Sequence, residues 1–292
     1  METAWDVLDA QWRNEVALDW SPSSGPVIVA LDSEKGGVGK TGLAGGLLAV
    51  AAAAGLTVIA VDLDPRATLT EELDAARTGQ YTVNDLLYVD PSADARDLPT
   101  LRGLAEQALR PAGASWPSSV QVLAAERALA HRESDVTANL ENRLKVSLQG
   151  VAEQVDLVVV DLPPRAGGKL VGSGLLAATQ GLVPATLDED GYIGARDALR
   201  TIEITTGSDP NPMRPVGVVR NIVDRRTTLA KTYDDKLRED YGPDLLDVVI
   251  PKRVLRQEAR TACVPITTAS GAEARALRNA YTLVLNRIAE VA

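Results

Sequence analysis

One short stretch of the sequence, SEKGGVGKT, holds the side chains best suited to chemistry. Gly36, Gly37 and Gly39 let the backbone turn with its N–H groups pointing inward, which makes a nest for phosphate oxygens. Lys40 would place its ammonium group on those oxygens, and Thr41 would offer its hydroxyl to Mg²⁺. The stretch therefore predicts a site that binds a phosphorylated ligand together with a divalent cation.

The same stretch departs from the usual phosphate-binding pattern, G-x-x-x-x-G-K-[ST], in two ways. Glu34 occupies the position of the first glycine, and Lys35 adds a lysine that the pattern does not require. Three later glycines can still form the nest, so we expect the backbone from Gly36 to Gly42, including Val38, to hold the phosphates. The alternative is a glycine-rich turn that only caps a helix.

Three aspartates strengthen the prediction of a phosphate site. VDLDP ends one predicted strand with Asp62 and Asp64, and VVVDLPP ends the most apolar strand with Asp161. In a doubly wound sheet, ligands bind outside the carboxyl ends of the strands, so all three carboxylates can reach one site. Taken alone, each would more often be a solvated aspartate at a strand end. Together with the loop, they lead us to expect Thr41, Asp62 and Asp161 to serve Mg²⁺.

The elements that must position these residues alternate between strand and helix. A strand at 26–32, the glycine loop, a helix ending near Gly55 and a strand at 57–64 form a βαβ unit. The alternation continues to the end of the chain, which predicts one α/β domain over 26–292, with a doubly wound, mostly parallel sheet flanked by helices. Residues 1–25 are expected to form an N-terminal arm. Further strands are predicted at 120–125, 155–163, 181–187, 214–223 and 247–251, and further helices at 82–89, 134–150, 195–205, 227–242, 254–262 and 270–290.

Composition excludes several classes of protein. The chain has 292 residues, and its net charge of −10 disfavours indiscriminate wrapping by nucleic acid, so any DNA binding must come from a local basic patch. A single cysteine, Cys263, excludes a disulfide framework and a cysteine-bound metal cluster. No apolar run is long enough to span a membrane, and the acidic start does not match a signal peptide. We expect a cytoplasmic protein.

The motifs together resemble those of a known family. KGGVGKT, with its extra lysine, is similar to the deviant Walker A motif of the ParA/MinD superfamily, VDLDP to its second motif, and VVVDLPP to its Walker B segment. Other stretches resemble ParA landmarks: TVNDLL, VLAAERALAHRESD, GLVPATL, GVVRNIVDRRTTLAKTYDDKL and VVIPKRVLRQEARTACVPI. The similarity runs from residue 26 to the end, and it is closer to ParA, the DNA-partition ATPase, than to MinD.

The resemblance implies three catalytic residues. Lys35 matches the lysine that, in the family, crosses a dimer interface to contact the partner subunit's nucleotide. Lys40 matches the phosphate-binding lysine, and Asp64 matches the aspartate that orients the attacking water. Phosphoryl transfer is catalysed mainly by positioning and by neutralising charge, so a second cation supplied by another subunit would couple hydrolysis to dimerisation.

The resemblance also implies ATP and Mg²⁺ as cofactors. Thr41 and Asp161 match the magnesium residues, and Asn221 and Pro251 fall at positions that line the adenine pocket in relatives. Two positions depart from the family: Gly42 where a second threonine is common, and Arg66 where glutamine is common. These changes leave hydrolysis plausible and its rate open.

The function implied is that of a slow partition ATPase. ParA proteins bind nonspecific double-stranded DNA as ATP-loaded homodimers, and a ParB-like centromere-binding partner stimulates hydrolysis. Two stretches near the C-terminus are locally basic, and phosphate contacts alone would give sequence-independent, salt-sensitive binding. The expected DNA-binding residues are Arg225, Arg226, Arg253, Arg256 and Arg260. The last three are spaced to share one face of a helix, which could instead be an ordinary solvated face.

Two other functions remain open from the sequence. A MinD-like positioning ATPase would lie on a membrane through a basic amphipathic C-terminal helix, but ALRNAYTLVLNRIAEVA carries few charges and is more typical of a core-packing helix. A nucleotide switch that positions a protein cargo is the second alternative. The sequence does not name the cargo, which could be a plasmid, a phage, a chromosome or a protein assembly, nor does it name the partner.

Overall fold

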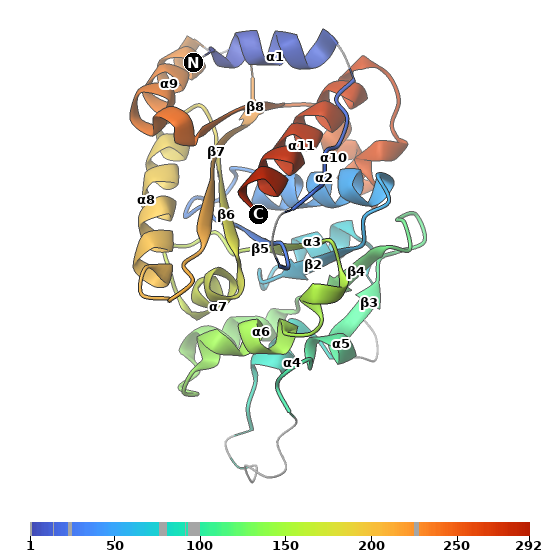
Figure 1. The fold of residues 1–292 in the computed structure, drawn as a ribbon, viewed down its shortest axis with the longest axis vertical. Coiled ribbons are helices and arrows are strands. Elements are labelled where there is room, and N and C mark those ends of the chain that lie inside the picture. The colour runs from blue at the N-terminus through green and yellow to red at the C-terminus, as the bar shows by residue number, and fades with distance from the viewer. Residues whose placement is uncertain are drawn as a thin grey trace.

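A computed structural model describes residues 2–13, 15–22, 25–75, 81–90, 92, 100–224 and 228–292. Its centre is an eight-stranded sheet with the order β3-β4-β2-β5-β1-β6-β7-β8 (Figure 1). The strands are β1 Ile28–Leu31, β2 Val58–Asp62, β3 Leu109–Pro111, β4 Val120–Leu123, β5 Leu157–Asp161, β6 Gln180–Ala185, β7 Arg214–Val223 and β8 Leu245–Pro251. Among these strands β3 alone runs antiparallel to its neighbour. The doubly wound, mostly parallel sheet predicted from the sequence is confirmed.

Helices cover both faces of the sheet and bury two hydrophobic clusters (Figure 1). The helices are α1 Ala4–Arg13, α2 Lys40–Ala53, α3 Thr68–Glu72, α4 Val83–Leu87, α5 Ala105–Ala108, α6 Leu140–Leu148, α7 Lys169–Ala177, α8 Glu189–Thr206, α9 Thr228–Tyr241, α10 Val254–Thr261 and α11 Ala272–Val291. Side chains from α2, α10 and α11 enter one cluster, and side chains from α6, α7, α8 and α9 enter the other. Strand β1 shows why the sheet needs both layers, since Ile28 and Ala30 face one cluster while Val29 and Leu31 face the other.

The N-terminal segment packs against the outer strand of the sheet. Helix α1 crosses β8, and the Gln11 side-chain carbonyl accepts a hydrogen bond from the Val249 backbone amide at 3.1 Å. The Gln11 backbone carbonyl accepts a second bond from Asn279 on α11 at 2.7 Å. The first bond satisfies a backbone amide on an otherwise exposed strand edge, and the second ties α1 to α11. The boundary between an arm at 1–25 and a domain at 26–292 stays a prediction.

The structure differs from the sequence-based elements in the middle of the chain. The helix expected over 134–150 is shorter in the structure: α6 covers Leu140–Leu148, and the 3₁₀ helix Arg127–Ser134 ends where the expected helix would begin. Asn139 precedes α6 with φ of 58°, in the left-handed region that interrupts a helix. No strand was expected in the proline-rich stretch that contains β3. The strand can form there because β3 lies at the edge of the sheet, where proline is tolerated.

Two adjacent glycines in α2 make room for side chains from distant parts of the chain. A Cβ added at Gly45 would lie 2.0 Å from the Glu72 Oε1 atom. One added at Gly46 would lie 2.3 Å from the ring of Tyr281, a fully buried residue on α11. The pair therefore permits α2 to pack closely against α3 and α11. None of the described helices is both long and apolar enough to cross a membrane.

This packing predicts a destabilised Gly46→Ala variant. The added methyl group overlaps the Tyr281 ring, and overpacking of this kind costs about 1–3 kcal/mol of unfolding free energy. Gly42→Ala is the matched control on the same helix, because a Cβ there meets nothing within 4 Å. It should be neutral or stabilising by up to about 1 kcal/mol through helix propensity. Urea unfolding checks both, and equal stability of the two variants would contradict the packing argument.

Candidate functional site

The glycine loop joins β1 to the first turn of α2. Gly37 and Gly39 have φ of 88° and 84°, in the left-handed region that favours glycine. At Gly39 a side chain is excluded by space as well, since a Cβ would lie 2.7 Å from Ile222 and 2.8 Å from Asn221. The Asn221 side-chain amide donates to the Val38 carbonyl at 2.8 Å. The left-handed glycines are compatible with the expected phosphate nest, and the end of β7 holds the loop in place.

Helix α8 holds the other side of the loop. Thr201 donates a hydrogen bond to the Glu34 carboxylate at 2.8 Å, which gives a structural role to the residue at the position of the missing glycine. The Lys35 ammonium lies 2.6 Å from an Asp190 carboxylate oxygen, with side chains 47% and 64% exposed. Exposed ion pairs contribute little, so Lys35 can leave this contact at small cost.

Lys40 is buried at the base of the loop. Its ammonium donates to the Ser33 backbone carbonyl at 2.7 Å. Burial lowers the pKa of Lys40, and the nearby carboxylates of Asp161, Asp32 and Asp64 oppose that change. The loop also lines a cavity with Lys40 in its wall, so the ammonium needs only a side-chain rotation to reach an anion placed there.

Thr41 and Asp161 contact each other directly. The Thr41 hydroxyl donates to Asp161 Oδ2 at 2.6 Å. Burial raises the pKa of Asp161, and its Oδ1 atom has no hydrogen-bond partner among the described residues. A hydroxyl beside a buried carboxylate with one unpartnered oxygen fits Mg²⁺, which prefers oxygen ligands and retains several waters. The expected magnesium role of Thr41 and Asp161 is compatible with this geometry.

Asp62 and Asp64 occupy different environments. Asp62 is fully buried, and its carboxylate accepts bonds from the Asp64 amide at 3.1 Å and from the Thr70 amide and hydroxyl at 2.8 Å each. Burial raises its pKa to about 6. Both oxygens thus organise the turn after β2, and a magnesium role for Asp62 stays a prediction. Asp64 lines the cavity beside the glycine loop, and its carboxylate accepts a bond from the Arg66 amide at 2.9 Å.

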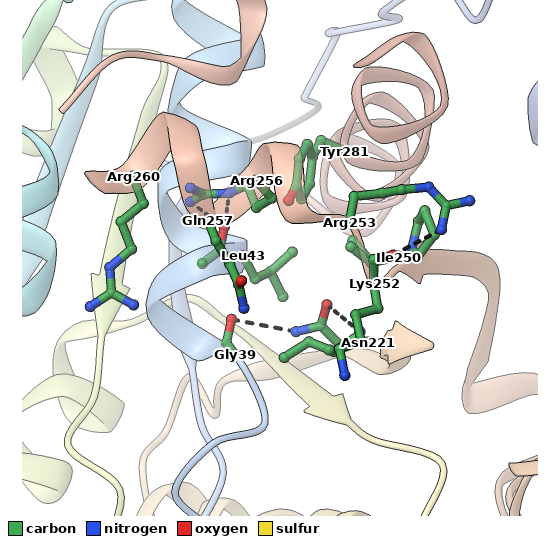
Figure 2. Close-up of a pocket in the computed structure, with 13 residues that line it drawn as sticks. Gly39, Leu43, Asn221, Ile250, Lys252, Arg253, Arg256, Gln257, Arg260 and Tyr281 are labelled. Atoms are coloured by element: carbon green, nitrogen blue, oxygen red, sulfur yellow. Dashed lines mark hydrogen bonds between the residues drawn. The ribbon is translucent and has the colours of Figure 1, made fainter. Parts of the chain in front are cut away.

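Two cavities meet at the carboxyl end of the sheet. The first, of about 140 Å³, lies between α2, α10, α11 and the ends of β7 and β8 (Figure 2). Asn221 and Pro251 line it, which is compatible with the expected adenine pocket. The second, of about 350 Å³, is lined by the whole loop from Gly36 to Gly42 with Asp64. Five residues line both cavities: Gly39, Gly42, Ile222, Gln257 and Arg260.

The expectation that Arg253, Arg256 and Arg260 share one helix face is corrected, because α10 begins at Val254 and only Arg256 and Arg260 lie on it, both near Glu72. Arg253 precedes the helix and lies near Glu273, with its guanidinium over the Trp12 ring. Arg256 points into the protein, where it binds the Gly42 carbonyl and Glu72. Figure 2 shows Arg253 and Arg260 at opposite ends of the cavity.

The burial of Arg256 removes it from the expected DNA surface. The cause is the space left by Gly45, next to which the guanidinium and the Glu72 carboxylate lie. Arg225 and Arg226, the other expected DNA contacts, lie outside the described residues.

Several residues of the site were not anticipated. Asp32 is fully buried, and neither carboxylate oxygen has a hydrogen-bond partner among the described residues. Burial raises its pKa to about 7, although Lys40 opposes the change. Ile222 has φ of 53°, a strained conformation for a β-branched residue, and it covers Gly39. The sequence does not predict either feature, because an aspartate and an isoleucine at these positions have no distinctive local pattern.

Comparison with known proteins agrees with this geometry. A family model described as an AAA domain matches residues 27–211. The chromosome partitioning protein ParA of Caulobacter vibrioides is 30% identical, over 82% of this chain and 85% of its own length. The chromosome-partitioning ATPase Soj of Thermus thermophilus is also 30% identical, over 84% and 91%.

Solved structures show the same fold. Cobyrinic acid a,c-diamide synthase of Mycobacterium smegmatis, with bound ATP analogue and magnesium, has a TM-score of 0.66 and 25% identity, over 87% of this chain and 92% of its own. The complex of a Cyanothece McdA variant with ATP has a TM-score of 0.72 and 16% identity, over 90% and 97%. The fold and the loop define a P-loop ATPase of the deviant Walker A type. Within that class, the chain belongs to the AAA-domain family of ParA-type partition ATPases.

Asp32 predicts an unusual dependence of stability on pH. Its pKa rises from 3.8 to about 7 on folding, so the folded protein binds this proton more tightly than the unfolded chain does. The resulting stabilisation is present below about pH 4 and is lost as the pH rises towards about 7. Between about pH 5 and pH 8 the wild type should lose on the order of 2–3 kcal/mol from this group alone.

The isosteric Asp32→Asn variant replaces the titratable carboxyl group with a neutral amide. Its free energy of unfolding, measured by urea titration, should therefore rise relative to the wild type as the pH increases. Asp64→Asn serves as a carboxylate control in the same site. A constant difference between wild type and Asp32→Asn across this pH range would show that Asp32 is not held protonated.

Proposed function

We propose that this protein is a Mg²⁺-dependent, ParA-type ATPase that partitions DNA. The ATP-loaded homodimer binds nonspecific double-stranded DNA in the cytoplasm, where it associates with the nucleoid. A ParB-like centromere-binding partner stimulates its slow hydrolysis and releases it. The observation that carries the proposal is the pair of joined cavities behind the glycine loop, with Lys40 buried beneath the loop and Lys35 exposed at its edge.

The two cavities suit the two parts of ATP. The first has an apolar wall from Leu43, Ile250 and Pro251, with the Asn221 amide nearby, which suits a flat, polar-edged base. The second offers the amides of the glycine loop and the Lys40 ammonium to the phosphates. When bound with ATP, Mg²⁺ would neutralise charge on the phosphate oxygens, and Thr41 with Asp161 would hold it.

Lys40 and Asp64 have distinct tasks in hydrolysis. Lys40 exchanges the Ser33 carbonyl for phosphate oxygens and stabilises the negative charge that shifts during transfer. Asp64 lines the same cavity and is oriented by its bond from the Arg66 amide. It orients the attacking water. The Arg66 side chain replaces the glutamine common in relatives and adds a cation to this wall.

Lys35 makes the site depend on a second subunit. It lies outside the buried part of the loop and forms an exposed ion pair with Asp190. In the dimer it leaves Asp190 and reaches the phosphates bound to the partner. A cation supplied in this way acts only when two loaded subunits meet, so dimerisation and nucleotide retention become coupled.

The DNA-binding part of the proposal rests on relatives and on local charge. The related ParA and Soj proteins are named for chromosome partitioning. The segment around Arg225 and Arg226 remains the proposed DNA surface, together with Arg253. Helix α11 argues against a MinD-like membrane contact, because its apolar side chains, among them Leu277, Tyr281 and Leu285, are buried in the core.

The first test measures retention of the protein on nonspecific double-stranded DNA with Mg·ATP, with Mg·ADP and without nucleotide. Retention should require Mg·ATP and should fall steeply with salt, because phosphate contacts release counterions. Lys40→Ala should remove nucleotide binding and with it the retention. Equal retention in all three nucleotide states would leave the partition function without a mechanism.

The second test concerns Lys35. Lys35→Ala should stay monomeric with Mg·ATP on size-exclusion chromatography while the wild type dimerises. Lys145→Ala is the matched control, because Lys145 also forms an ion pair of 2.6 Å with an aspartate, Asp209, but lies on α6 away from the loop. A Lys35→Ala protein that still dimerises with Mg·ATP would exclude the proposed role.

A further inference from the structure

Helix α10 is tied to both the glycine-loop helix and the segment after β2. The Arg256 guanidinium lies 2.7 Å from the Gly42 carbonyl and 2.5 Å from Glu72 Oε1. The two side chains are 12% and 1% exposed, so the pair is desolvated. Separating the two members of such a pair would leave a buried charge without a partner, which is costly. Arg256 is therefore fixed in this position. Arg256 thus positions α10 against the loop.

The other oxygen of Glu72 is less well paired. Glu72 Oε2 is buried and has no hydrogen-bond partner among the described residues. Arg260, one turn after Arg256, approaches this oxygen, with 3.9 Å between Nε and Oε2. The Arg260 side chain is 49% exposed. The contact is long and partly solvated, so it restrains the guanidinium only weakly.

Arg260 lies where the two cavities meet. It lines the base cavity together with Asn221 and Pro251, and it lines the loop cavity together with Lys40 and Asp64. In Figure 2 its guanidinium extends from α10 along the side of α2, away from Arg253. Gln257, one turn earlier, also lines both cavities. A planar group with several N–H donors at this place is suited to phosphate oxygens.

We propose that Arg260 binds the phosphate chain of the nucleotide within its own subunit. This inference rests on the proposed function, because it requires the two cavities to hold a nucleotide. On binding, Arg260 exchanges its long contact with Glu72 for phosphate oxygens. Arg256 stays on Glu72, so the carboxylate keeps its counter-ion and the exchange costs little. Arg260 is therefore a nucleotide residue and not a DNA contact, and Gln257 closes the same junction with a neutral amide.

The experiment measures the affinity for Mg·ADP and Mg·ATP by calorimetry in the absence of DNA. Arg260→Gln should weaken both by about tenfold, the effect of losing one hydrogen bond to a charged group. Arg260→Lys keeps the charge but lacks the planar donors, so its nucleotide affinity should lie between those of the wild type and Arg260→Gln. The loss should shrink at high salt, because screening weakens the wild-type contact. Arg275→Gln, an exposed arginine on α11 that lines neither cavity, is the matched control and should bind like the wild type.

The outcomes separate this inference from the proposed function. If Lys40→Ala abolishes binding and Arg260→Gln matches the wild type, the role of Arg260 is excluded while the nucleotide site stands. If Arg260→Gln binds nucleotide normally but loses retention on DNA with Mg·ATP, Arg260 is a DNA contact and the proposal is overturned. If neither the wild type nor any variant binds nucleotide, the proposed function itself fails. Thermal unfolding of each variant establishes that it is folded.

Discussion

Parallel pairing of β5 between β1 and β2 is the constraint on which the site depends. The register aligns Leu31 with Asp161 and Asp62 with Asp161, so the three strands end at the same level. Each strand is buried on both faces, and its backbone bonds are used in the sheet. The polar groups that follow the strands therefore emerge together at one edge. The glycine loop, the turn after β2 and the Asp161 carboxylate meet there because the three strands end side by side.

Burial at this edge brings several ionisable side chains together away from water. Asp32, Asp62 and Asp161 are almost inaccessible to water, and desolvation raises the pKa of each. Lys40 lies among them, and desolvation lowers its pKa. Buried ionisable groups with shifted pKa values are costly to stability and are common at functional sites.

Around the edge, the helices act as supports more than as sources of ligands. Helix α8 holds Glu34, the end of β7 holds Val38, and α10 holds the Gly42 carbonyl through Arg256. Three separate parts of the chain thus fix one loop of a few residues. Small residues make this possible, because the glycines of α2 admit the Glu72 carboxylate and the Tyr281 ring.

Much of this could be predicted from the sequence, because the relevant signals are local. Apolar runs predicted the strands, and the glycines followed by Lys40 and Thr41 predicted the loop. The apolar strand that ends in Asp161 predicted a magnesium residue there. The tertiary structure alone decided which arginine of α10 is buried, since that depends on Gly45 and Glu72, both far away in the chain. It also decided that Asp32 is fully buried and that Arg260 borders both cavities. A periodic pattern predicts which residues share a helix face, but the neighbours of that face are decided only when distant segments pack together.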